Sequence, residues 1–384
     1  MNATRSRTAS AKSSSASNLA EPLQQIDRTH VLHQGHKLIY FAGCDYFRLA
    51  SHPEILRAVH TSLDELGLNV AASRKTTGNH FIYGELENSI ARFFGTESAL
   101  LVSNGYATNL AVAQALAGEF IHALVDERAH GSLLDAASAL GCPVVLFPHR
   151  DANAAEKIAQ RILRRRPAKS KLLLITDGLF SHSGETAPLD EYLRRLPSNV
   201  TLLVDDAHGA GILGKQGRGT AEYLGLEPDS RLIQTITLSK AFGTYGGAIL
   251  GPTALRRKII KRSRLFVGNT PLPLPLAAGG LAALQLVGAN PKLRRRLHFN
   301  SSYVKAALRE AGFPINDGPG PIIPIHPRHS QKVALLKGRL LSAGIHPPYI
   351  NYLGGPRDGY FRFVISSEHT AADLDTLVGA LAVK

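Results

Sequence analysis

Four polar clusters of this sequence each follow a short apolar run, and they contain residue types from which a catalytic site could be built. The clusters cover residues 104–109, 177–185, 205–211 and 239–243. Each has an ordinary interpretation on its own. A lone lysine is usually a surface amine, an aspartate at a strand end is usually a helix cap, and a Gly-Tyr pair is usually a plain turn. Their combination in this order points to chemistry.

The four clusters together supply the groups that pyridoxal phosphate (PLP) requires of a protein. Lys240 offers an amine for a Schiff base with the cofactor, and Asp205 offers a carboxylate that would keep the pyridine nitrogen protonated. Segment 104–109 opens a helix, whose N-terminal N–H groups could hold the phosphate. The sequence therefore predicts a PLP enzyme in which Lys240 carries the cofactor.

The elements that must position these clusters are six short apolar segments, which we predict to be strands buried on both faces. They cover residues 98–103, 144–147, 172–176, 201–204, 235–238 and 247–250. Segments with apolar residues at helical spacing, such as 154–166, lie between them. This alternation predicts an α/β fold with a mainly parallel sheet covered by helices, in which ligands bind at the carboxyl ends of the strands.

The length of the chain favours more than one domain, and we predict four segments. They are a basic, serine-rich tail at 1–20, an N-terminal segment at 21–50, a large domain at 51–270 and a smaller C-terminal α/β domain at 271–384. The tail is interpreted as disordered, with an organellar transit peptide as the alternative. The proline-rich segment 271–275 is the predicted hinge. Beyond it we expect helices over 276–308 with a break at Asn290-Pro291, strands near 321–325 and 360–366, and a last helix from Thr370.

The charge and the cysteines narrow the classes of partner. The net charge of +14 lies partly in clusters that could attract coenzyme A, an acidic carrier protein or nucleic acid, or that could be solvated helix faces. Aromatic residues are not interleaved with these charges, so we expect no nucleic-acid partner. No apolar run reaches the ~18–20 residues of a membrane span. The two cysteines offer neither a disulfide framework nor a metal site, which favours a cytoplasmic protein without a metal.

Seven motifs give the segment from about residue 44 to residue 251 a resemblance to the alpha-oxoamine synthases. These are PLP enzymes of aminotransferase class I/II, with the aminotransferase-like fold (fold type I). The motifs are DY at 45–46, GNHFIYGELE at 78–87, NGY at 104–106, DERAHGS at 126–132, DGLFSHSGETAPL at 177–189, DDAHGAGILGKQGRGT at 205–220 and TLSKAFGTYGG at 237–247. The resemblance continues more weakly to the C-terminus. Two of the motifs, DDAHGAGILG and SKAFG, are highly specific.

The resemblance implies three catalytic roles. Lys240 matches the Schiff-base lysine and the base that removes the Cα proton, and Asp205 matches the partner of the pyridinium nitrogen. His208 matches a group that hydrogen-bonds the phenolic oxygen of the cofactor and polarises the carbonyl of an acyl donor.

The resemblance also implies cofactor contacts for six further residues. Gly105, Tyr106 and Thr237 would contact the phosphate, His130 would stack on the ring, Ser181 would share the phenolic oxygen, and Thr270 would reach the phosphate of the neighbouring subunit. The last contact implies a homodimer.

The chain departs from the family at three places that bear on the substrate. Residues 68–72 replace a glycine-rich stretch before Ser73-Arg74, a pair that the resemblance places near the substrates. His346 stands before two prolines, where the family has an arginine that grips the carboxylate of the amino acid. Arg362 matches a second family arginine and could partly substitute, and 182–183 are His-Ser in place of Met-Asp. The cofactor apparatus is intact, whereas the substrate apparatus has diverged.

Two functional classes follow from these residues. The first is C-acyl transfer, in which an amino acid condenses with an acyl thioester of coenzyme A or an acyl-carrier protein and decarboxylates to an α-aminoketone. The second is another transformation of the amino acid on the same fold, such as transamination. A protein without catalysis would be expected to have lost Lys240, which is present. The sequence leaves the amino acid and the acyl group open.

Overall fold

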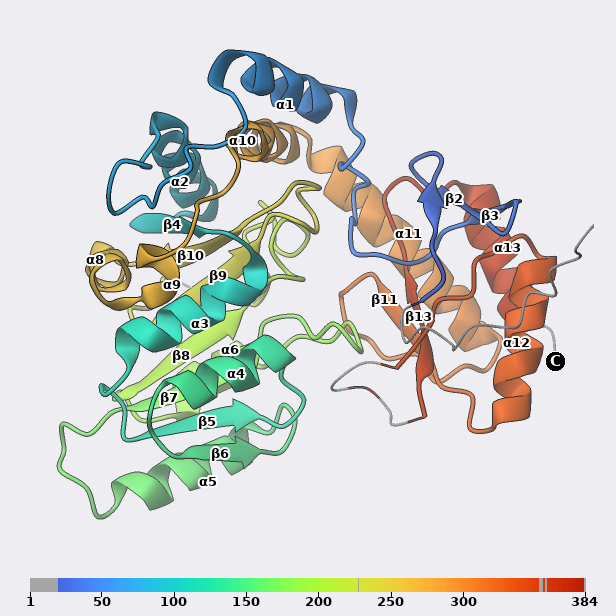
Figure 1. Cartoon of the computed structure of the whole chain (residues 1–384). Helices are drawn as coiled ribbons and strands as arrows, with labels where there is room; N and C mark the ends of the chain where they lie inside the picture. Colours follow the sequence, from blue (N-terminus) through green and yellow to red (C-terminus); the bar gives the residue numbers. More distant parts are fainter. Residues whose placement is uncertain (1–19, 227, 352–354, 356–357, 383–384) are drawn as a thin grey trace, which may run out of the picture.

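The structure consists of a larger body built on a seven-stranded sheet and a smaller body built on a three-stranded sheet (Figure 1). It is a computed structural model, which describes residues 20–382 except 227, 352–354 and 356–357. The predicted tail at 1–20 lies outside these residues apart from its last one. None of the helices in the described part of the chain is both long and apolar enough to span a membrane.

The large sheet is parallel except for one strand, as the sequence predicted. Its strands in spatial order are β4 (Ser98–Val102), β10 (Gly247–Gly251), β9 (Leu232–Thr237), β8 (Val200–Asp205), β7 (Leu172–Asp177), β5 (His122–Asp126) and β6 (Val144–Phe147). Strand β10 runs antiparallel to both of its neighbours, and the remaining pairs are parallel. All six predicted strands are present, and β5 is an additional strand that the apolar-run pattern missed.

Alternate residues of each central strand pack on opposite faces of the sheet, because successive side chains of a strand point to opposite sides. Leu173 packs in a core with α3 (Gly105–Leu116) and α4 (Gly131–Ala139), whereas Leu174 packs in a core with α5 (Ala152–Leu163) and α6 (Leu189–Arg195). The prediction of two buried faces is wrong for β6. Its Val144 and Leu146 are 40% and 55% exposed, unlike the residues of β4, the other edge strand.

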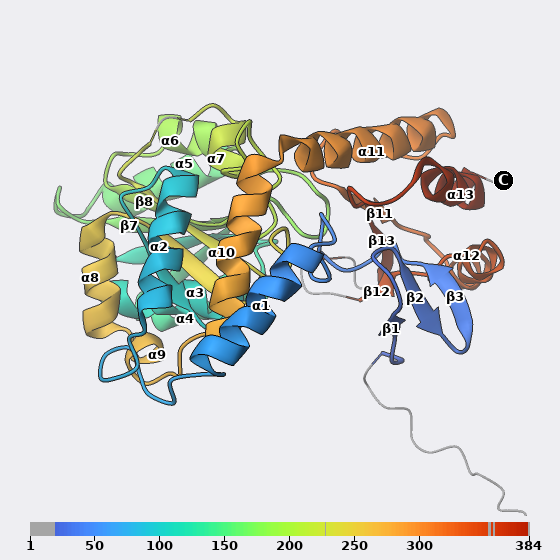
Figure 2. The ribbon, with the colours of Figure 1, turned by 90° about the horizontal axis from the view of Figure 1, so that it is seen from above.

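The two bodies are joined by a pair of long helices. Helix α10 (Leu274–Ala289) packs on α1 (Pro53–Leu66) and α2 (Phe81–Phe94) of the larger body, and α11 (Pro291–Glu310) packs on α13 (Ala371–Ala382) of the smaller one (Figure 2). Gly279 lets α10 approach α1, because a Cβ there would lie 2.9 Å from Val59 Cγ2. The predicted break at Asn290-Pro291 is confirmed. The domain boundary predicted after residue 270 stays a prediction. We propose that the chain crosses from the larger body to the smaller one at Asn290.

The smaller body combines the C-terminal region with the N-terminal segment. Strands β11 (Ile322–Ile325), β13 (Tyr360–Val364) and β12 (Tyr349–Ile350) form its antiparallel sheet, which shares a core with α12 (Ser330–Ser342) and α13. A three-stranded sheet of β1 (Gln24–Gln25), β2 (His30–His33) and β3 (His36–Ile39) adjoins it, because Ile39 N donates to Gly344 O at 2.8 Å.

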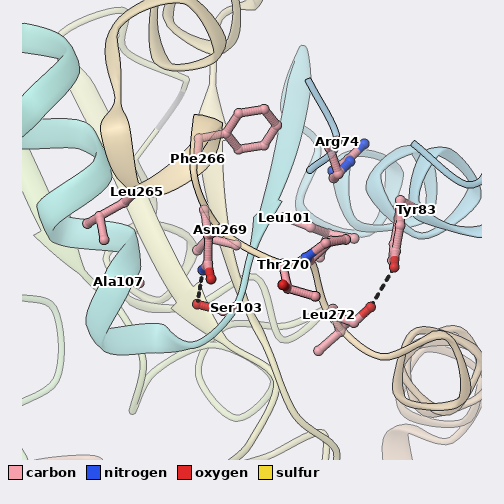
Figure 3. A pocket seen from close by; sticks show the side chains of 12 residues that line it. Arg74, Tyr83, Leu101, Ser103, Ala107, Leu265, Phe266, Asn269, Thr270 and Leu272 are labelled. Atoms are coloured by element: carbon pink, nitrogen blue, oxygen red, sulfur yellow. Dashed lines mark hydrogen bonds between the residues drawn. The ribbon is translucent and has the colours of Figure 1, made fainter. Parts of the chain in front are cut away.

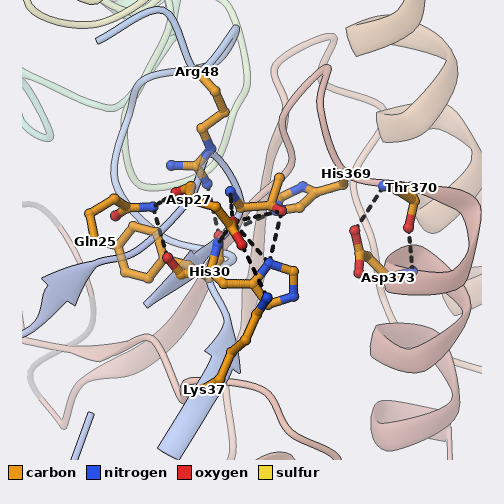
Figure 4. Close-up of polar contacts among 10 residues, drawn as sticks. Gln25, Asp27, His30, Lys37, Arg48, His369, Thr370 and Asp373 are labelled. Atoms are coloured by element: carbon orange, nitrogen blue, oxygen red, sulfur yellow. Dashed lines mark hydrogen bonds and ion pairs between the residues drawn. The ribbon is translucent and has the colours of Figure 1, made fainter. Parts of the chain in front are cut away.

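The first loop of this N-terminal sheet is fixed by one carboxylate. Asp27 accepts hydrogen bonds from the backbone N–H groups of Thr29 and His30 and pairs with Lys37 at 3.2 Å (Figure 4). The remaining helices of the described residues are the short α7 (Thr220–Tyr223) and α9 (Arg264–Val267) and the longer α8 (Thr253–Arg262).

Candidate active site

Lys240 lies in the turn after β9, in a cavity of about 220 Å³ at the carboxyl ends of the strands. The cavity brings together most of the residues predicted to bind the cofactor. Its lining is Asn104, Gly105, Tyr106, His130, Ser132, Asp177, Asp205, Ala207, His208, Thr237, Ser239 and Lys240. These residues come from the ends of β4, β5, β7, β8 and β9, so the sheet rather than any single loop assembles the site.

The amine of Lys240 faces an imidazole. Its Nζ lies 2.7 Å from Nε2 of His208, whose Nδ1 lies 2.6 Å from the hydroxyl of Tyr46. Burial lowers the pKa of Lys240, because an ammonium loses its hydration there. Burial, and then the charge of Lys240, hold the pKa of His208 well below its usual value. His208 is therefore neutral near pH 7, and a larger fraction of the Lys240 amine is unprotonated and able to accept a substrate proton than in an ordinary surface lysine.

Asp205 is a buried carboxylate that the protein orients from two sides. Its Oδ2 accepts from Asn109 Nδ2 at 2.7 Å, and its Oδ1 accepts from Ala207 N at 3.0 Å. Asn109 is held in turn by the hydroxyl of Thr235, which donates to its Oδ1 at 2.7 Å. Sequence reasoning placed Asn109 in the 104–109 cluster but gave it no role. Its position on the first turns of α3, facing β8, was the missing information.

A second carboxylate, Asp177, lies directly beside Asp205 in the register of β7 and β8. Burial raises the pKa of Asp177 well above its usual value, and the charge of Asp205 adds to this. Its Oδ2 accepts from the backbone N–H of His130 at 2.9 Å, and His130 is also the N-cap of α4. Asp177 thus fixes the loop that places the His130 ring in the cavity, a role that the sequence did not indicate.

The turn at the start of α3 has the form of a phosphate site. Asn104 caps the helix by accepting from Ala107 N at 2.9 Å, so the helix N-terminus opens into the cavity. Gly105 lies against β9, where a Cβ would come within 2.9 Å of Thr237 Cβ. Only glycine fits this position, and the Thr237 hydroxyl lies beside it, 2.7 Å from Ser239 Oγ. Tyr106 stands half-exposed at the rim, with its hydroxyl bonded to Asp135.

Arg362 reaches the site from the smaller body. It lies on β13, and its guanidinium donates to Ser181 O at 3.4 Å and to Cys44 Sγ at 3.7 Å. Its charge contributes to the lowered pKa values of Lys240 and His208. Ser181 is buried in the loop after β7 and is not among the residues that line the Lys240 cavity. Cys44, which the sequence gave no role, therefore belongs to the site.

His346 lies elsewhere. Its ring packs edge-on against His33, with centroids 5.4 Å apart, and near Tyr40 at 6.0 Å. Its Nδ1 is buried without a hydrogen-bond partner among the described residues, and burial lowers its pKa. The structure brings His346 to β2 and β3 and not to the lining of the Lys240 cavity.

Ser73, Arg74 and Thr270 are also outside the Lys240 cavity of their own chain. Arg74 forms a buried ion pair with Glu87 and lies over the ring of Tyr83, 5.1 Å from its centroid. Ser73 Oγ donates to Val267 O. Arg74 and the exposed Thr270 line a separate small pocket behind the start of α3 (Figure 3).

The substituted pair His182-Ser183 lines a cavity of about 510 Å³ that Arg128, Asn316 and His326 also line. His182 is 8% exposed, and burial lowers its pKa to about 4.

Comparisons with known proteins agree on one family. The profile of the family "Aminotransferase class I and II" matches residues 37–381. The 8-amino-7-oxononanoate synthase of Methylococcus capsulatus is 35% identical over 360 residues, which cover 92% of this chain and 91% of that protein. The enzyme of the same name from Thioalkalivibrio sulfidiphilus is 36% identical over 349 residues, covering 90% of this chain and 88% of that one.

Solved structures show the same fold. The serine palmitoyltransferase of Sphingomonas wittichii superposes with a TM-score of 0.86 at 26% identity, covering 93% of this chain and 89% of that one. The same enzyme from S. paucimobilis, with bound PLP and myriocin, gives 0.86 at 25% identity, covering 94% and 90%. The 8-amino-7-oxononanoate synthase of Francisella tularensis gives 0.77 at 23% identity, covering 90% and 97%.

Proposed function

The chain belongs to the aminotransferase class I and II family, among its alpha-oxoamine synthases, and from this premise we propose a specific activity. The protein is a PLP-dependent C-acyltransferase, which condenses an amino acid with an acyl thioester and releases carbon dioxide, a thiol and an α-aminoketone. The observation that carries the proposal is the meeting of Lys240, His208 and Asp205 in one cavity beside the start of α3. The relatives named above support the acyl-transfer class over the others.

The residues of the cavity fit PLP. Lys240 would bind the aldehyde, Asp205 the pyridine nitrogen, and the N–H groups of Gly105 and Tyr106 with the Thr237 hydroxyl the phosphate. The fit depends on Gly105, whose missing Cβ leaves the start of α3 against Thr237. When bound, PLP withdraws electrons from the Cα atom of an amino acid and so makes its proton removable.

The charge state of each side chain determines its role in the reaction. Lys240, with its lowered pKa, takes the Cα proton, and the neutral His208 remains a hydrogen-bond partner rather than a second cation. Arg362, which can hold a carboxylate with two parallel hydrogen bonds, binds the amino acid. Arg362 donates to Ser181 O, so the smaller body contributes a cation beside the loop that follows β7.

A thiol-release screen tests the proposal. The full chain, saturated with PLP, is mixed with each of a set of amino acids and with acyl-CoA or acyl-carrier thioesters, and free thiol is measured together with the α-aminoketone. Thiol release that requires both substrates supports C-acyl transfer. A keto acid formed without any thioester would instead establish transamination, the alternative on this fold. Lys240→Ala is the control for uncatalysed hydrolysis.

Assembly and location are part of the same proposal. We propose a homodimer in which Thr270 of one chain contacts the phosphate bound by the other, because Thr270 is exposed and lies outside its own Lys240 cavity. A cytoplasmic location without a nucleic-acid partner remains the expectation from the composition.

A further inference from the structure

The side-chain amide of Asn109 connects the two residues that would contact the PLP ring, Asp205 at its nitrogen and His130 at its face. Asn109 lies on α3 and is fully buried. Its Nδ2 donates to Asp205 Oδ2 at 2.7 Å and to Ser132 Oγ at 3.0 Å. The Ser132 hydroxyl in turn lies 2.8 Å from Nδ1 of His130. Asp205 and His130 line the Lys240 cavity, whereas Asn109 lies behind them and is not among its lining residues.

The amide of Asn109 has only one orientation that fits its neighbours. Its Oδ1 accepts from the hydroxyl of Thr235 at 2.7 Å, and Thr235 lies opposite Asp205 in the register of β8 and β9. An amide nitrogen can only donate, and an ionised carboxylate can only accept. The reversed amide would place Oδ1 against Asp205, where neither oxygen carries a hydrogen. Elements α3, β8 and β9 therefore fix which atom of Asn109 faces the carboxylate.

The hydrogen bond from Asn109 favours the charged form of Asp205. One oxygen of this carboxylate accepts from Asn109 and the other from the backbone N–H of Ala207 at 3.0 Å. Donors to a carboxylate stabilise its negative charge. A negative charge at this position is what would keep the pyridine nitrogen of PLP protonated. Loss of the Asn109 donor should therefore weaken both the position and the charge of the group that faces the ring nitrogen.

We propose that Asn109 is a positioning residue for the PLP ring. It holds Asp205 toward the ring nitrogen directly, and it holds His130 toward the ring face through the hydroxyl of Ser132. The inference rests on the proposed placement of PLP in the Lys240 cavity, and it does not depend on acyl transfer. Two properties of the bound cofactor should need Asn109: its affinity for the protein, and the pH at which its ring nitrogen loses a proton.

Both properties are measured without catalysis. Absorbance titration of the full chain gives the affinity for PLP, and NMR of PLP labelled with nitrogen-15 in the ring follows the ring proton as the pH is raised. In Asn109→Ala we expect the affinity to fall about tenfold or more, because a charge-assisted hydrogen bond is lost. The ring nitrogen should lose its proton at a lower pH than in the unmodified protein, because Asp205 holds its negative charge less well.

Asn300→Ala is the matched control for these measurements. Asn300 lies on α11 and is 5% exposed, and its Nδ2 also donates to two buried acceptors, Ser366 O at 3.0 Å and His369 O at 3.1 Å. Its substitution should lower the midpoint temperature of unfolding as Asn109→Ala does, because both changes leave buried acceptors without a donor. It should leave the affinity for PLP and the ring-nitrogen signal unchanged. An equal effect of both variants on the cofactor would overturn the proposal.

Two further variants test the two connections of Asn109 separately. Ser132→Ala removes only the connection to His130, so the affinity for PLP should fall while the pH at which the ring nitrogen loses its proton stays the same. Thr235→Val keeps the shape of the side chain but removes the hydroxyl that holds the amide, and it should shift both properties in the direction of Asn109→Ala. Added to Asn109→Ala, Thr235→Val should cause no further change, because Thr235 acts through the amide. Thr235→Val also provides the test if Asn109→Ala does not fold.

Asp205→Asn separates this inference from the placement of PLP on which it rests. This variant loses the carboxylate, so the ring nitrogen should lose its proton at a lower pH. If Asp205→Asn has no effect on the ring nitrogen, the placement of PLP is wrong. If Asp205→Asn has this effect and Asn109→Ala leaves the ring nitrogen unchanged, the placement holds and the role of Asn109 is wrong. A failed thiol-release screen has no bearing on either result, because no substrate is present.

Discussion

At the scale of single residues, burial and nearby acidic groups have opposite effects on the pKa of one amine, and burial has the larger effect. Burial lowers the pKa of Lys240 while the buried Asp205 and Asp177 act against this, so the amine remains titratable in a site with two carboxylates. The neutral form is the one that attacks an aldehyde. These residues come from β7, β8 and β9, and the chain separates them widely.

The first residue-scale prediction concerns the attachment of the cofactor. The purified protein should be yellow, and borohydride reduction followed by peptide mapping should label Lys240. Lys240→Ala should lose the covalent label but keep some noncovalent PLP, because Asp205 and the α3 turn are untouched. A label on any other lysine would disprove the assignment.

The second concerns the amino acid carboxylate. Arg362 contacts Ser181 and Cys44, whereas His346 packs against His33 and Tyr40. We therefore expect Arg362→Gln to weaken the binding of glycine, alanine or serine by roughly thirty- to a thousandfold, as loss of a charge-assisted pair of about 2–4 kcal/mol implies. His346→Ala should change it by about twofold or less. Titration of the cofactor absorbance measures both, and a large loss in His346→Ala would show that this imidazole does reach the substrate.

The third concerns stability at acidic pH. Burial lowers the pKa of His369 from 6.5 to about 3, so the folded chain keeps this imidazole neutral where the unfolded chain binds a proton. Stability is then fully present above pH 6.5 and falls below it, by up to about 1.4 kcal/mol per pH unit for this group. In His369→Gln, the midpoint temperature of thermal unfolding should fall less between pH 6.5 and pH 5 than it does in the unmodified protein. His329→Gln, at an exposed position, is the matched control and should keep the slope of the unmodified protein.

At the scale of elements, the glycine at the start of α3 sets how closely that helix approaches β9. Gly105→Ala would put a Cβ within 2.9 Å of Thr237 Cβ, so the turn must move away from the phosphate position. We expect PLP affinity to fall about tenfold or more while the fold is retained. Gly84→Ala on α2, where an added Cβ meets nothing within 4 Å, is the matched control. It should be neutral or stabilise by about 0.5–1 kcal/mol. Equal PLP affinity in both variants would argue against a phosphate at this turn.

The elements also show what sequence patterns could and could not predict. Apolar runs identified six strands of the large sheet, because strands buried between two helical layers need little else to define them. They missed β5, whose run of apolar residues is only Ala123–Val125. Motif residues predicted that Lys240, Asp205, His208 and the α3 turn act together, and the structure places them in one cavity. Cys44 and Asn109 could not be assigned, because their roles depend on which distant residues the fold brings beside them.

At the scale of the whole molecule, the site is shared between two bodies and, as proposed, between two chains. Arg362 belongs to the smaller body and Lys240 to the larger one, and α10 and α11 connect them (Figure 2). Any change in the angle at Asn290 would move the carboxylate-binding arginine relative to the lysine. Amino acid binding is thus expected to favour one relative position of the bodies.

The prediction at this scale is assembly. Light scattering of the PLP-loaded protein should give at least a dimer. Thr270→Ala should lower the affinity for PLP without dissociating the dimer. A monomer with full cofactor occupancy would contradict the shared site. Unchanged PLP affinity in Thr270→Ala would also contradict the shared site, because all phosphate contacts would then come from one chain.

The place of β10 in the sheet also has a consequence for biosynthesis. The α3 turn follows β4, an edge strand whose neighbour is β10, and β10 ends at Gly251. In a nascent chain, β4 therefore lacks its strand partner until residue 251 has left the ribosome. The phosphate turn and Lys240 come into register only when β10 enters between β4 and β9. Cofactor loading must then follow this late closure, and a ribosome that stalls before it leaves an aggregation-prone intermediate for chaperones to protect.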